Sequence, residues 1–428
     1  MSSPFEISPV KLIYGGEALG FHAGRTVLAP RILPGERAEV AEVRRQKGVI
    51  HARPLRILEP SPERVDPLCP YFGHCGGCQY QHLAYGAQVA AKTEILRETL
   101  RRLGQVKWEQ PIPAHSGPAW NYRNQAQLKI GKPPDGPPAL GFFEAESNRL
   151  VSIDACPILS PRLNALVTVL SSAAWISELA KGREVELLAD DRDEKVMLTL
   201  SGNWNGEEAE ALGRKCLAEL DGVATVAIAQ DDGVQVRGEP HLTYRLGTFA
   251  YRLSPTVFFQ SARFLLAELV TAVTGEASGA LAMDLYAGGG LFTLPLSMRF
   301  DQVMAAEAHP QAAADLAANA RAMHGKKIRT FAGTTFDFLR RCANMDPDLV
   351  VMDPPRAGVG AETLKLLLAL RPKRLHYVSC SPPTLARDLG FLLQRGYHLD
   401  HLELFDCFPH TYHIESIARL SRIGRERA

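Results

Sequence analysis

Residues 280–290, with the sequence ALAMDLYAGGG, combine a short apolar run, a polar end and three consecutive glycines. This pattern is typical of a strand that ends at a ligand-binding loop. Four further apolar runs, separated by segments with helical patterns, follow at residues 302–308, 327–333, 348–355 and 374–380. Strands that alternate with helices predict an α/β fold, with a doubly wound, mostly parallel Rossmann-like sheet from about residue 275 onward.

In sheets of this kind, ligands bind at the carboxyl ends of the strands. The polar residues at the predicted strand ends are Asp284, Tyr286, Glu307, Asp353 and Cys380. A glycine loop lets the backbone approach a ligand, and an acidic residue about 20 positions later, here Glu307, can bind ribose hydroxyls. The loop lacks the third spaced glycine of a pyrophosphate-binding motif. S-adenosylmethionine (SAM), an adenosine cofactor without pyrophosphate, therefore fits better than NAD.

The cysteines are distributed unevenly along the chain. Three of the eight lie within ten residues, at Cys69, Cys75 and Cys78. This spacing favours metal ligation over disulfides, since the chain is long and its first residues do not resemble a signal peptide. A fourth ligand is needed, and Cys156, which precedes a proline, is the natural candidate. The residues alone leave zinc and an iron–sulfur cluster both open, and Cys216 and Cys342 are expected in the core.

The N-terminal residues 1–58 contain several short strand-like runs separated by turns, which predicts a small barrel of the oligonucleotide-binding (OB) kind. Its expected basic face carries Arg44, Arg45, Lys47, Arg53 and Arg56. Residues 1–132 hold 18 Lys and Arg against 11 Asp and Glu, although the whole chain has a net charge of only +1. This asymmetry indicates a polyanionic partner, and the alternative is two domains of different isoelectric point.

Three domains are expected, at residues 1–58, 59–250 and 251–428. The second begins with the cysteine loop, continues with a helix over 87–104 that ends at Gly104, and then mixes strands and helices as an α+β domain. No apolar run of about 18 residues is present, so no membrane-spanning helix is expected. Without a signal-peptide pattern, we expect a cytoplasmic protein.

Six features follow one another along the chain in a specific order. They are the four-cysteine pattern, SPTVFFQ at 254–260, DLYAGGG at 284–290, DPPRAG at 353–358, SCSPPTLARDL at 379–389 and FPHTYHIESI at 408–417. Over nearly the whole length, the chain resembles the SAM-dependent RNA (uracil-5)-methyltransferase family. An N-terminal TRAM barrel together with four cysteines resembles the 23S rRNA branch, not the cluster-free tRNA branch. The resemblance implies a [4Fe–4S] cluster on the four cysteines and 23S rRNA as the substrate.

The same resemblance implies roles for individual residues. The Cys380 thiolate adds to C6 of uracil, which makes C5 nucleophilic towards the SAM methyl group. Glu415 then removes the C5 proton so that the thiol can leave. Gln260, Tyr286, Glu307 and Asp353 match positions that contact SAM or line the uracil pocket. The target base must leave its stack to reach Cys380, and the enzyme is expected to be monomeric.

Each assignment has a simpler alternative. Cys380 could be a small buried residue, and Glu415 a salt-bridged surface carboxylate. Phe258 and Phe259 could be core residues, and His410 and His413 could be polar residues with ordinary hydrogen bonds. Three residues depart from the family pattern, namely Ser381 in place of Asn, Thr334 in place of an acidic residue and Leu291 in place of Asn. The alternative functions are the same chemistry on tRNA, a non-catalytic RNA-binding protein and an NAD-type oxidoreductase.

Overall fold

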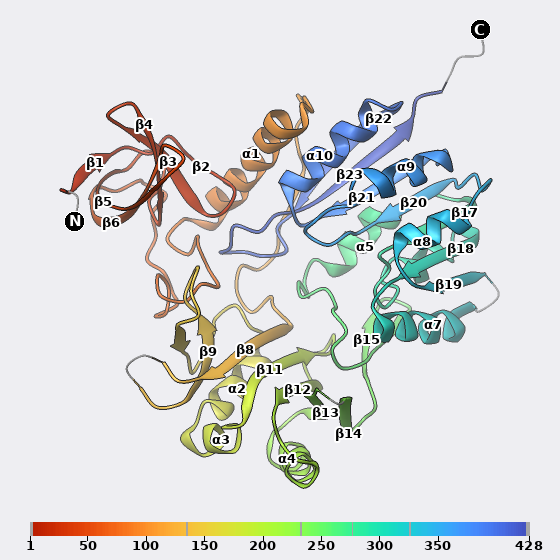
Figure 1. Cartoon of the computed structure of the whole chain (residues 1–428), viewed down its shortest axis with the longest axis horizontal. Coiled ribbons are helices and arrows are strands. Elements are labelled where there is room, and N and C mark those ends of the chain that lie inside the picture. The colour runs from red at the N-terminus through yellow and green to blue at the C-terminus, as the bar shows by residue number, and fades with distance from the viewer. Residues whose placement is uncertain (1–2, 134–135, 232, 276, 325–326, 425–428) are drawn as a thin grey trace.

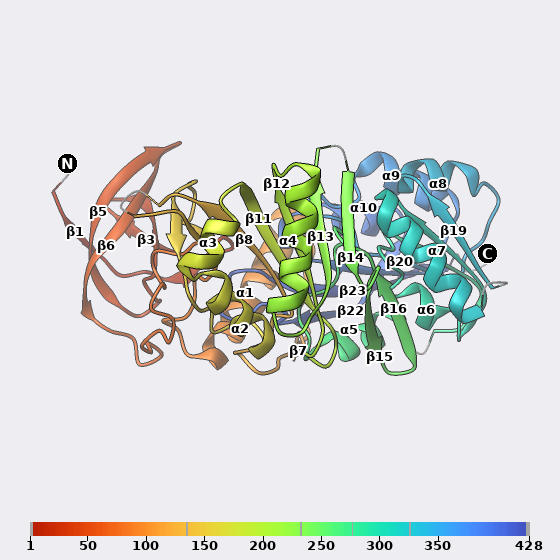
Figure 2. The ribbon, with the colours of Figure 1, turned by 90° about the horizontal axis from the view of Figure 1, so that it is seen from below.

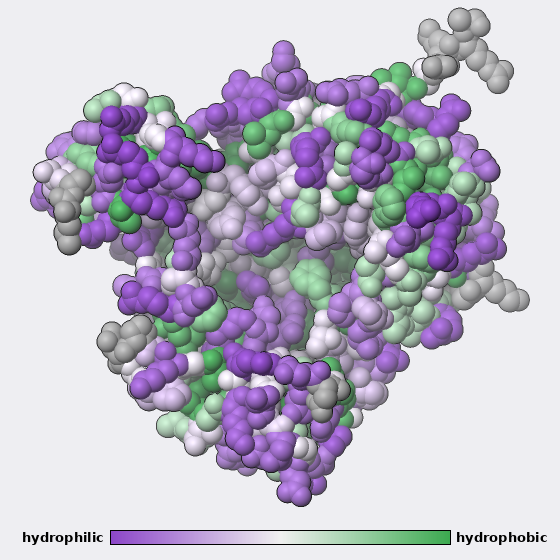
Figure 3. Space-filling model, in the orientation of Figure 1, coloured by the Kyte–Doolittle hydropathy of each residue, from purple (hydrophilic) through white to green (hydrophobic). Residues whose placement is uncertain are grey.

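The computed structural model describes residues 3–133, 136–231, 233–275, 277–324 and 327–424. Within these residues, sheets of six, seven and eight strands form the centres of three lobes, which lie at the corners of a triangle in Figure 1. Seen from below in Figure 2, the N-terminal lobe lies at one end and the C-terminal lobe at the other, with the central lobe between them. The surface is hollowed where the three lobes meet (Figure 3).

The N-terminal sheet consists of short strands in which buried and exposed residues alternate. Its strands are β1 (Phe5–Ile7), β2 (Lys11–Leu12), β3 (Glu17–His22), β4 (Arg25–Pro30), β5 (Arg37–Gln46) and β6 (Val49–Glu59), in the order β1-β5-β6-β4-β3-β2. Ala38 and Val40 of β5 are fully buried on the inner face, around which the sheet curls (Figure 1). The short strands predicted over residues 1–58 are confirmed.

The central sheet combines antiparallel pairs, one of them between strands remote in sequence, with one parallel pair. Its strands are β8 (Gln125–Gly131), β9 (Ala139–Phe143), β10 (Leu150–Ser152), β11 (Gly182–Ala189), β12 (Val196–Gly202), β13 (Val223–Gln230) and β14 (Gly233–Gly238). Its helices are α2 (Pro161–Leu170), α3 (Ala173–Glu178) and α4 (Gly206–Glu219). Leu163 of α2 and Cys216 of α4 lie in one hydrophobic core with the strands, so the core position predicted for Cys216 is confirmed.

The C-terminal sheet contains the five strands predicted from the apolar runs. These are β17 (Gly279–Leu285), β18 (Phe300–Glu307), β19 (Ile328–Ala332), β20 (Leu349–Met352) and β21 (Arg374–Ser379), and neighbouring strands among them are parallel. The remaining strands are β22 (Tyr397–Phe405), β23 (Glu415–Arg422) and β7 (Ala114–His115). The order is β19-β18-β17-β20-β21-β23-β22-β7, in which β23 runs antiparallel to both of its neighbours. A two-stranded ribbon, β15 (Leu242–Leu246) and β16 (Phe249–Leu253), precedes this sheet.

Helices cover both faces of the C-terminal sheet. They are α5 (Leu266–Thr274), α6 (Thr293–Leu296), α7 (Pro310–His324), α8 (Thr335–Arg341), α9 (Ala361–Ala369) and α10 (Pro382–Leu393). On β20, Val350 and Met352 share a core cluster with residues of α8, α9 and α10. Leu349 and Val351 share a different cluster with residues of α5, α6 and α7. Burial on both faces explains the continuous apolar runs in the sequence, and the predicted α/β fold is confirmed.

Helix α1 (Tyr85–Gly104) connects the cysteine loop to the C-terminal lobe by packing against α10. A Cβ at Gly104 would lie 2.2 Å from the carbonyl oxygen of Ala386 on α10, so only glycine permits this approach. The left-handed residue that ends the helix is Gln105, with φ 55°. The prediction that Gly104 caps the helix is therefore wrong, since Gln105 takes the left-handed position. Gly104 is required instead by the packing of α1 on α10.

The described part of the chain contains no helix that is both long enough and apolar enough to cross a membrane.

Candidate active site

Cys380 and Glu415 lie next to each other at the edge of the C-terminal sheet. Cys380 follows the last residue of β21, and Glu415 is the first residue of β23. The antiparallel register pairs Ser379 with Ser416, which places the next two residues, Cys380 and Glu415, opposite each other. Cys380 also directly precedes Ser381, the residue before the first turn of α10, so the positive end of that helix is close to the thiol.

The surroundings of these two residues suppress their charged forms. The pKa of the Cys380 thiol is raised to about 11, mainly by burial and then by the carboxylates of Glu415 and Asp353, while Arg356 opposes this rise. Glu415 is 2% exposed, and burial followed by the charge of Asp353 raises its pKa well above the usual range. Its Oε1 has no hydrogen-bond partner among the described residues. The alternative of a salt-bridged surface carboxylate is therefore wrong.

Asp353 and Gln260 bring two distant motifs together. Asp353 follows β20, and burial raises the pKa of its carboxyl to about 7, while a hydrogen bond to the Gln260 side chain opposes this rise. Gln260 is 7% exposed and belongs to the segment between β16 and α5. The contact joins SPTVFFQ to DPPRAG beside Cys380 and Glu415.

The glycine loop after β17 lies where the sequence predicts a cofactor site. Gly288 and Gly290 have φ angles of 55° and 96°, which L-residues rarely adopt. The Glu307 carboxylate accepts the Gly288 N–H at 2.8 Å, so the predicted acidic residue does lie at this loop. Tyr286 also has positive φ, 63°, and its side chain lies near Thr335, at the start of α8.

The three departures from the family pattern have identifiable structural contacts. Ser381 is 8% exposed, and its N–H donates to Ser379 Oγ at 3.1 Å. Thr334 caps α8, because its Oγ1 accepts the Asp337 N–H at 3.1 Å. Leu291 is 7% exposed and its carbonyl accepts the Tyr251 hydroxyl at 3.0 Å. None of the three replaces a residue assigned here to methyl transfer.

The family model described as tRNA (Uracil-5-)-methyltransferase matches residues 84–423. The chain belongs to this family. The 23S rRNA (uracil(1939)-C(5))-methyltransferase RlmD of Alkalilimnicola ehrlichii is 34% identical over 456 residues, covering 99% of this chain and 98% of the relative. An uncharacterized RNA methyltransferase of Aquifex aeolicus is 33% identical over 425 residues, covering 97% and 98%. The sequence-based resemblance is thereby confirmed, and the NAD-type oxidoreductase is excluded.

A solved structure shares the fold of this uracil-5-methyltransferase family member over most of its length. The Pyrococcus abyssi tRNA (uracil-54, C5)-methyltransferase, in complex with S-adenosyl-L-homocysteine, matches with a TM-score of 0.76 at 23% sequence identity. The match covers 97% of this chain and 100% of that chain. The chain is therefore a SAM-dependent RNA uracil-5-methyltransferase, and its mixed α/β fold is that of the neighbour.

Two residues of α7 that sequence analysis missed fix the segment after β16 and the glycine loop. Asp315 accepts the Ser254 N–H at 2.6 Å and the Ser254 hydroxyl at 2.7 Å. Asn319 donates to the Gly289 carbonyl at 2.8 Å and accepts the Arg252 N–H at 2.8 Å. The only sequence signal was a pair of polar residues four positions apart in an alanine-rich segment. This spacing places both side chains on one face of a helix, but it does not predict which segment that face contacts.

Phe258 and Phe259 have opposite environments. Phe259 is 3% exposed and packs with Tyr244 and Tyr251, as expected of a core residue. Phe258 is 68% exposed, so the alternative that it is a core residue is wrong. Its ring lies two residues from Gln260, which contacts Asp353. The methyltransferase therefore presents an exposed aromatic ring on the segment that enters its active site.

The four predicted metal ligands come together from two segments. Burial raises the pKa of Cys78 to about 12, and the nearby thiols of Cys156, Cys75 and Cys69 add to this rise. Cys156 is held by its N–H, which donates to Asn164 Oδ1 at 2.7 Å. Over the described ranges, no three His, Cys, Asp or Glu side chains are grouped closely enough to hold a metal ion.

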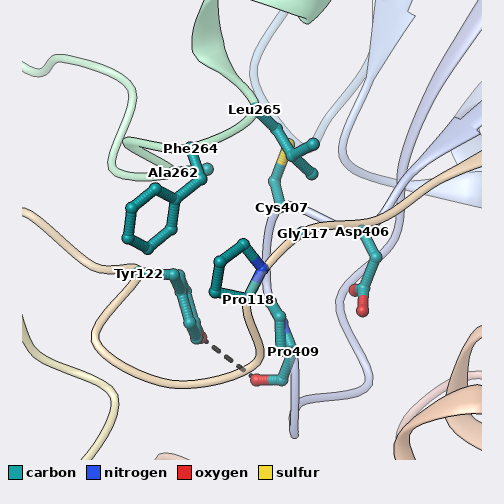
Figure 4. Close-up of a pocket in the computed structure, with 9 residues that line it drawn as sticks. All are labelled: Gly117, Pro118, Tyr122, Ala262, Phe264, Leu265, Asp406, Cys407 and Pro409. Carbon is teal, nitrogen blue, oxygen red and sulfur yellow. Dashed lines mark hydrogen bonds between the residues drawn. The ribbon is translucent and has the colours of Figure 1, made fainter.

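A small apolar pocket lies between segments that are remote in sequence (Figure 4). Its lining comes from three segments, and Tyr122 donates a hydrogen bond to the Pro409 carbonyl at 3.1 Å across it. The lining residues are Gly117, Pro118, Tyr122, Ala262, Phe264, Leu265, Asp406, Cys407 and Pro409. None of the predicted site residues is among them. The pocket lies where residues 117–122 and 262–265 pack against the segment that follows β22.

Proposed function

We propose that this enzyme transfers the methyl group of SAM to C5 of a uridine in 23S rRNA, with Cys380 as the nucleophile and Glu415 as the general base. The observation that carries the proposal is the placement of Cys380 opposite Glu415, with Asp353 close enough to affect both. A protein that only binds RNA needs neither a strand-end thiol nor a buried carboxylate beside it.

The first task of the site is to generate a thiolate. The thiol pKa of about 11 means that Cys380 is mostly protonated at neutral pH in the free enzyme. The N-terminal end of α10 and the guanidinium of Arg356 both favour the thiolate. Addition of the thiolate to C6 forms the C–S bond and leaves the negative charge on the ring as an enolate, which is nucleophilic at C5.

The second task is to remove a proton. After methylation, C5 carries both the methyl group and the original hydrogen. Glu415 takes this hydrogen as a proton, the electron pair reforms the C5–C6 double bond, and the thiolate leaves from C6. The buried setting of Glu415 raises its pKa, so its carboxylate is less populated than that of an exposed residue but is a stronger base.

The cofactor pocket is formed by the glycine loop and its neighbours. SAM, when bound, supplies the methyl group that C5 attacks. Glu307 at the end of β18 is positioned to accept hydrogen bonds from the ribose hydroxyls, and Tyr286 forms a wall of the pocket. Gln260 and Asp353, which hold each other, line the side of the pocket that faces Cys380.

RNA is held by surface groups outside this pocket. The exposed ring of Phe258 offers a stacking surface for an unstacked base. The five basic residues predicted to form one face, Arg44, Arg45, Lys47, Arg53 and Arg56, are all exposed on β5, β6 and the turn between them. They form a phosphate-binding surface, and the target uridine must be flipped out of its stack to reach Cys380.

The four cysteines are the proposed ligands of a [4Fe–4S] cluster because their thiols lie close enough to influence one another's pKa values. A cubane cluster binds one thiolate at each of its four irons. Backbone N–H groups also face these sulfurs, as Gly77 does towards Cys75 Sγ at 3.4 Å. Such a cluster would supply no redox step here, and its part would be to fix the cysteine loop.

The choice of 23S rRNA rests on the relatives named RlmD and on the combination of a curled N-terminal sheet with four cysteines. The alternative substrate is tRNA, on which the structural neighbour acts. Mapping of 5-methyluridine in 23S rRNA and tRNA from a deletion strain, with and without the plasmid-borne gene, decides between them. A 23S rRNA site that disappears and returns supports the proposal, whereas a tRNA site that does so contradicts it. The domain boundaries at 58/59 and 250/251, the monomeric state and the cytoplasmic location stay predictions.

A further inference from the structure

Tyr14, in a turn of the N-terminal sheet, contacts Cys380, the proposed nucleophile in the C-terminal lobe. It lies in the turn between β2 and β3, followed by Gly15 and Gly16 with φ angles of 110° and 93°. Its hydroxyl donates to the carbonyl oxygen of Cys380 at 3.5 Å, the outer limit of a hydrogen bond. Its ring meets the ring of Tyr412 edge to face, with 5.5 Å between centroids.

Gly16, the second glycine after Tyr14, packs the turn against the cysteine loop. A Cβ on Gly16 would lie 2.9 Å from Cγ of Gln79, so the turn and the loop are in direct contact. Gln79 in turn donates its backbone N–H to the His410 carbonyl at 2.9 Å and accepts the Tyr412 N–H at 3.3 Å. His410 and Tyr412 belong to the segment between β22 and β23, which extends toward the N-terminal lobe in Figure 1.

These contacts of Tyr14 and Tyr412 lie beside both Cys380 and Glu415, the two residues of the proposed reaction centre. Tyr412 lies three residues before Glu415 on the same segment, and Cys380 is the residue whose carbonyl Tyr14 contacts. Burial raises the pKa of the Tyr14 hydroxyl to about 12, so it keeps its proton at neutral pH and acts as a donor. Cys380 and Arg356 are both close enough to influence it.

We infer that Tyr14 is a positioning residue for methyl transfer, supplied by the N-terminal sheet: its hydroxyl and ring hold the Cys380 turn and Tyr412 in the arrangement that thiolate attack requires. This inference rests on the proposed function, in which Cys380 is the nucleophile. It gives the N-terminal sheet a part in the chemical step in addition to RNA binding. The active site is then complete only when this sheet is docked on the C-terminal lobe.

The test compares Tyr14→Phe, which removes only the hydroxyl, with Tyr14→Ala and with the control Tyr397→Phe. Tyr397 donates its hydroxyl to the Pro372 carbonyl at 2.6 Å, far from the site in the fold, so the control loses the same kind of bond. For each full-length protein, three quantities are measured. They are the Kd for a 23S rRNA transcript, kcat and KM for methylation, and the rate at which iodoacetamide labels Cys380 between pH 6 and 10.

Tyr14→Phe is expected to lower kcat by roughly two- to tenfold, the effect of one neutral hydrogen bond, and to change the pH profile of Cys380 labelling. Tyr14→Ala should lower kcat further, while RNA affinity stays within about twofold of wild type for Tyr14→Phe. The inference is overturned if Tyr14→Phe matches Tyr397→Phe in both kcat and labelling, or if only its RNA affinity falls. Failure of the proposed function looks different, because wild type itself would then form no adduct with 5-fluorouridine RNA.

Discussion

Cys380, directly after β21, faces Glu415, the first residue of β23, across an antiparallel strand pair. The pairing of Ser379 with Ser416 fixes this relationship through backbone hydrogen bonds, not through flexible side chains. A strand ladder is a rigid support, so the proposed nucleophile and the proposed base would keep a constant separation during the reaction. Strand β23, which runs antiparallel to its two neighbours, is thus the element that brings Glu415 to Cys380.

The two residues are expected to fail at different steps. Cys380→Ala should abolish turnover and adduct formation while SAM binding survives, because no C–S bond can form. In the Glu415→Gln enzyme, Cys380 should still add to C6 and the methyl group should still be transferred. Elimination of the Cys380 thiolate should be roughly 10²- to 10⁴-fold slower, because the base is missing. Denaturing gels of reactions with labelled SAM would show a methylated RNA–protein adduct only for Glu415→Gln. Cys342→Ala, a change in a core cysteine, is the control and should keep its turnover.

Labelling of Cys380 should depend on pH in a defined direction. Because its pKa is about 11, the rate of alkylation by iodoacetamide should rise about tenfold per pH unit from neutral pH towards that value. Arg356→Ala removes a positive charge that favours the thiolate, so labelling at a given pH should slow by roughly two- to fivefold. Arg356→Lys keeps the charge and should restore the rate. Equal rates for Arg356→Ala and wild type would show that Arg356 does not act on this thiol.

Iron content tests the role of the four cysteines. Protein purified without air should contain about four iron atoms per chain, and Cys156→Ser should lose most of them, since three ligands hold a cubane cluster poorly. Cys216→Ala, in the hydrophobic core of the central sheet, should keep the iron. One zinc and no iron in anaerobic wild-type protein would contradict the cluster.

The basic face of the N-terminal sheet should set the salt dependence of RNA binding. Replacement of Lys47, Arg53 and Arg56 with Ala should reduce the slope of log K against log salt by roughly 0.7 per lost phosphate contact, with unchanged SAM affinity. The control replaces Lys181, Lys195 and Lys215, which form exposed ion pairs elsewhere. An identical salt slope in both triple variants would assign the phosphate contacts to another surface.

The ion pair between Lys92 of α1 and Asp406 should contribute to stability. Both side chains are fully buried, with 2.6 Å between Nζ and Oδ1, and Lys92 also donates to the Phe408 carbonyl. Lys92→Ala should lower the free energy of unfolding by about 3–5 kcal/mol, because Asp406 is left as an uncompensated buried charge. The double variant Lys92→Met, Asp406→Leu should recover most of this loss in denaturant unfolding. If the single and double variants are equally unstable, the loss comes from packing and not from the unpaired charge.

Several features of the fold and the site could be predicted from sequence because they depend on neighbours in the chain. The five parallel strands of the C-terminal sheet appear as apolar runs, since strands covered on both faces need apolar residues at every position. The polar residues at their ends meet at one edge because parallel strands all point the same way, which is why Glu307 lies at the glycine loop as predicted. The proline after Cys156 likewise indicated this residue as the fourth ligand, and its thiol lies close enough to Cys78 to influence the Cys78 pKa.

Other features depended on contacts between segments that are remote in sequence. The exposure of Phe258, the burial of Glu415 and the tight packing of Gly104 on Ala386 follow from which surface covers each residue. Periodicity cannot predict this, because an aromatic or a glycine has the same local pattern in either environment. Tyr14 is the clearest case, since only the docking of the N-terminal sheet on the C-terminal lobe brings it to Cys380. The sequence by itself thus determined the strands and the chemistry at their ends, whereas tertiary packing decided which distant side chains complete the site.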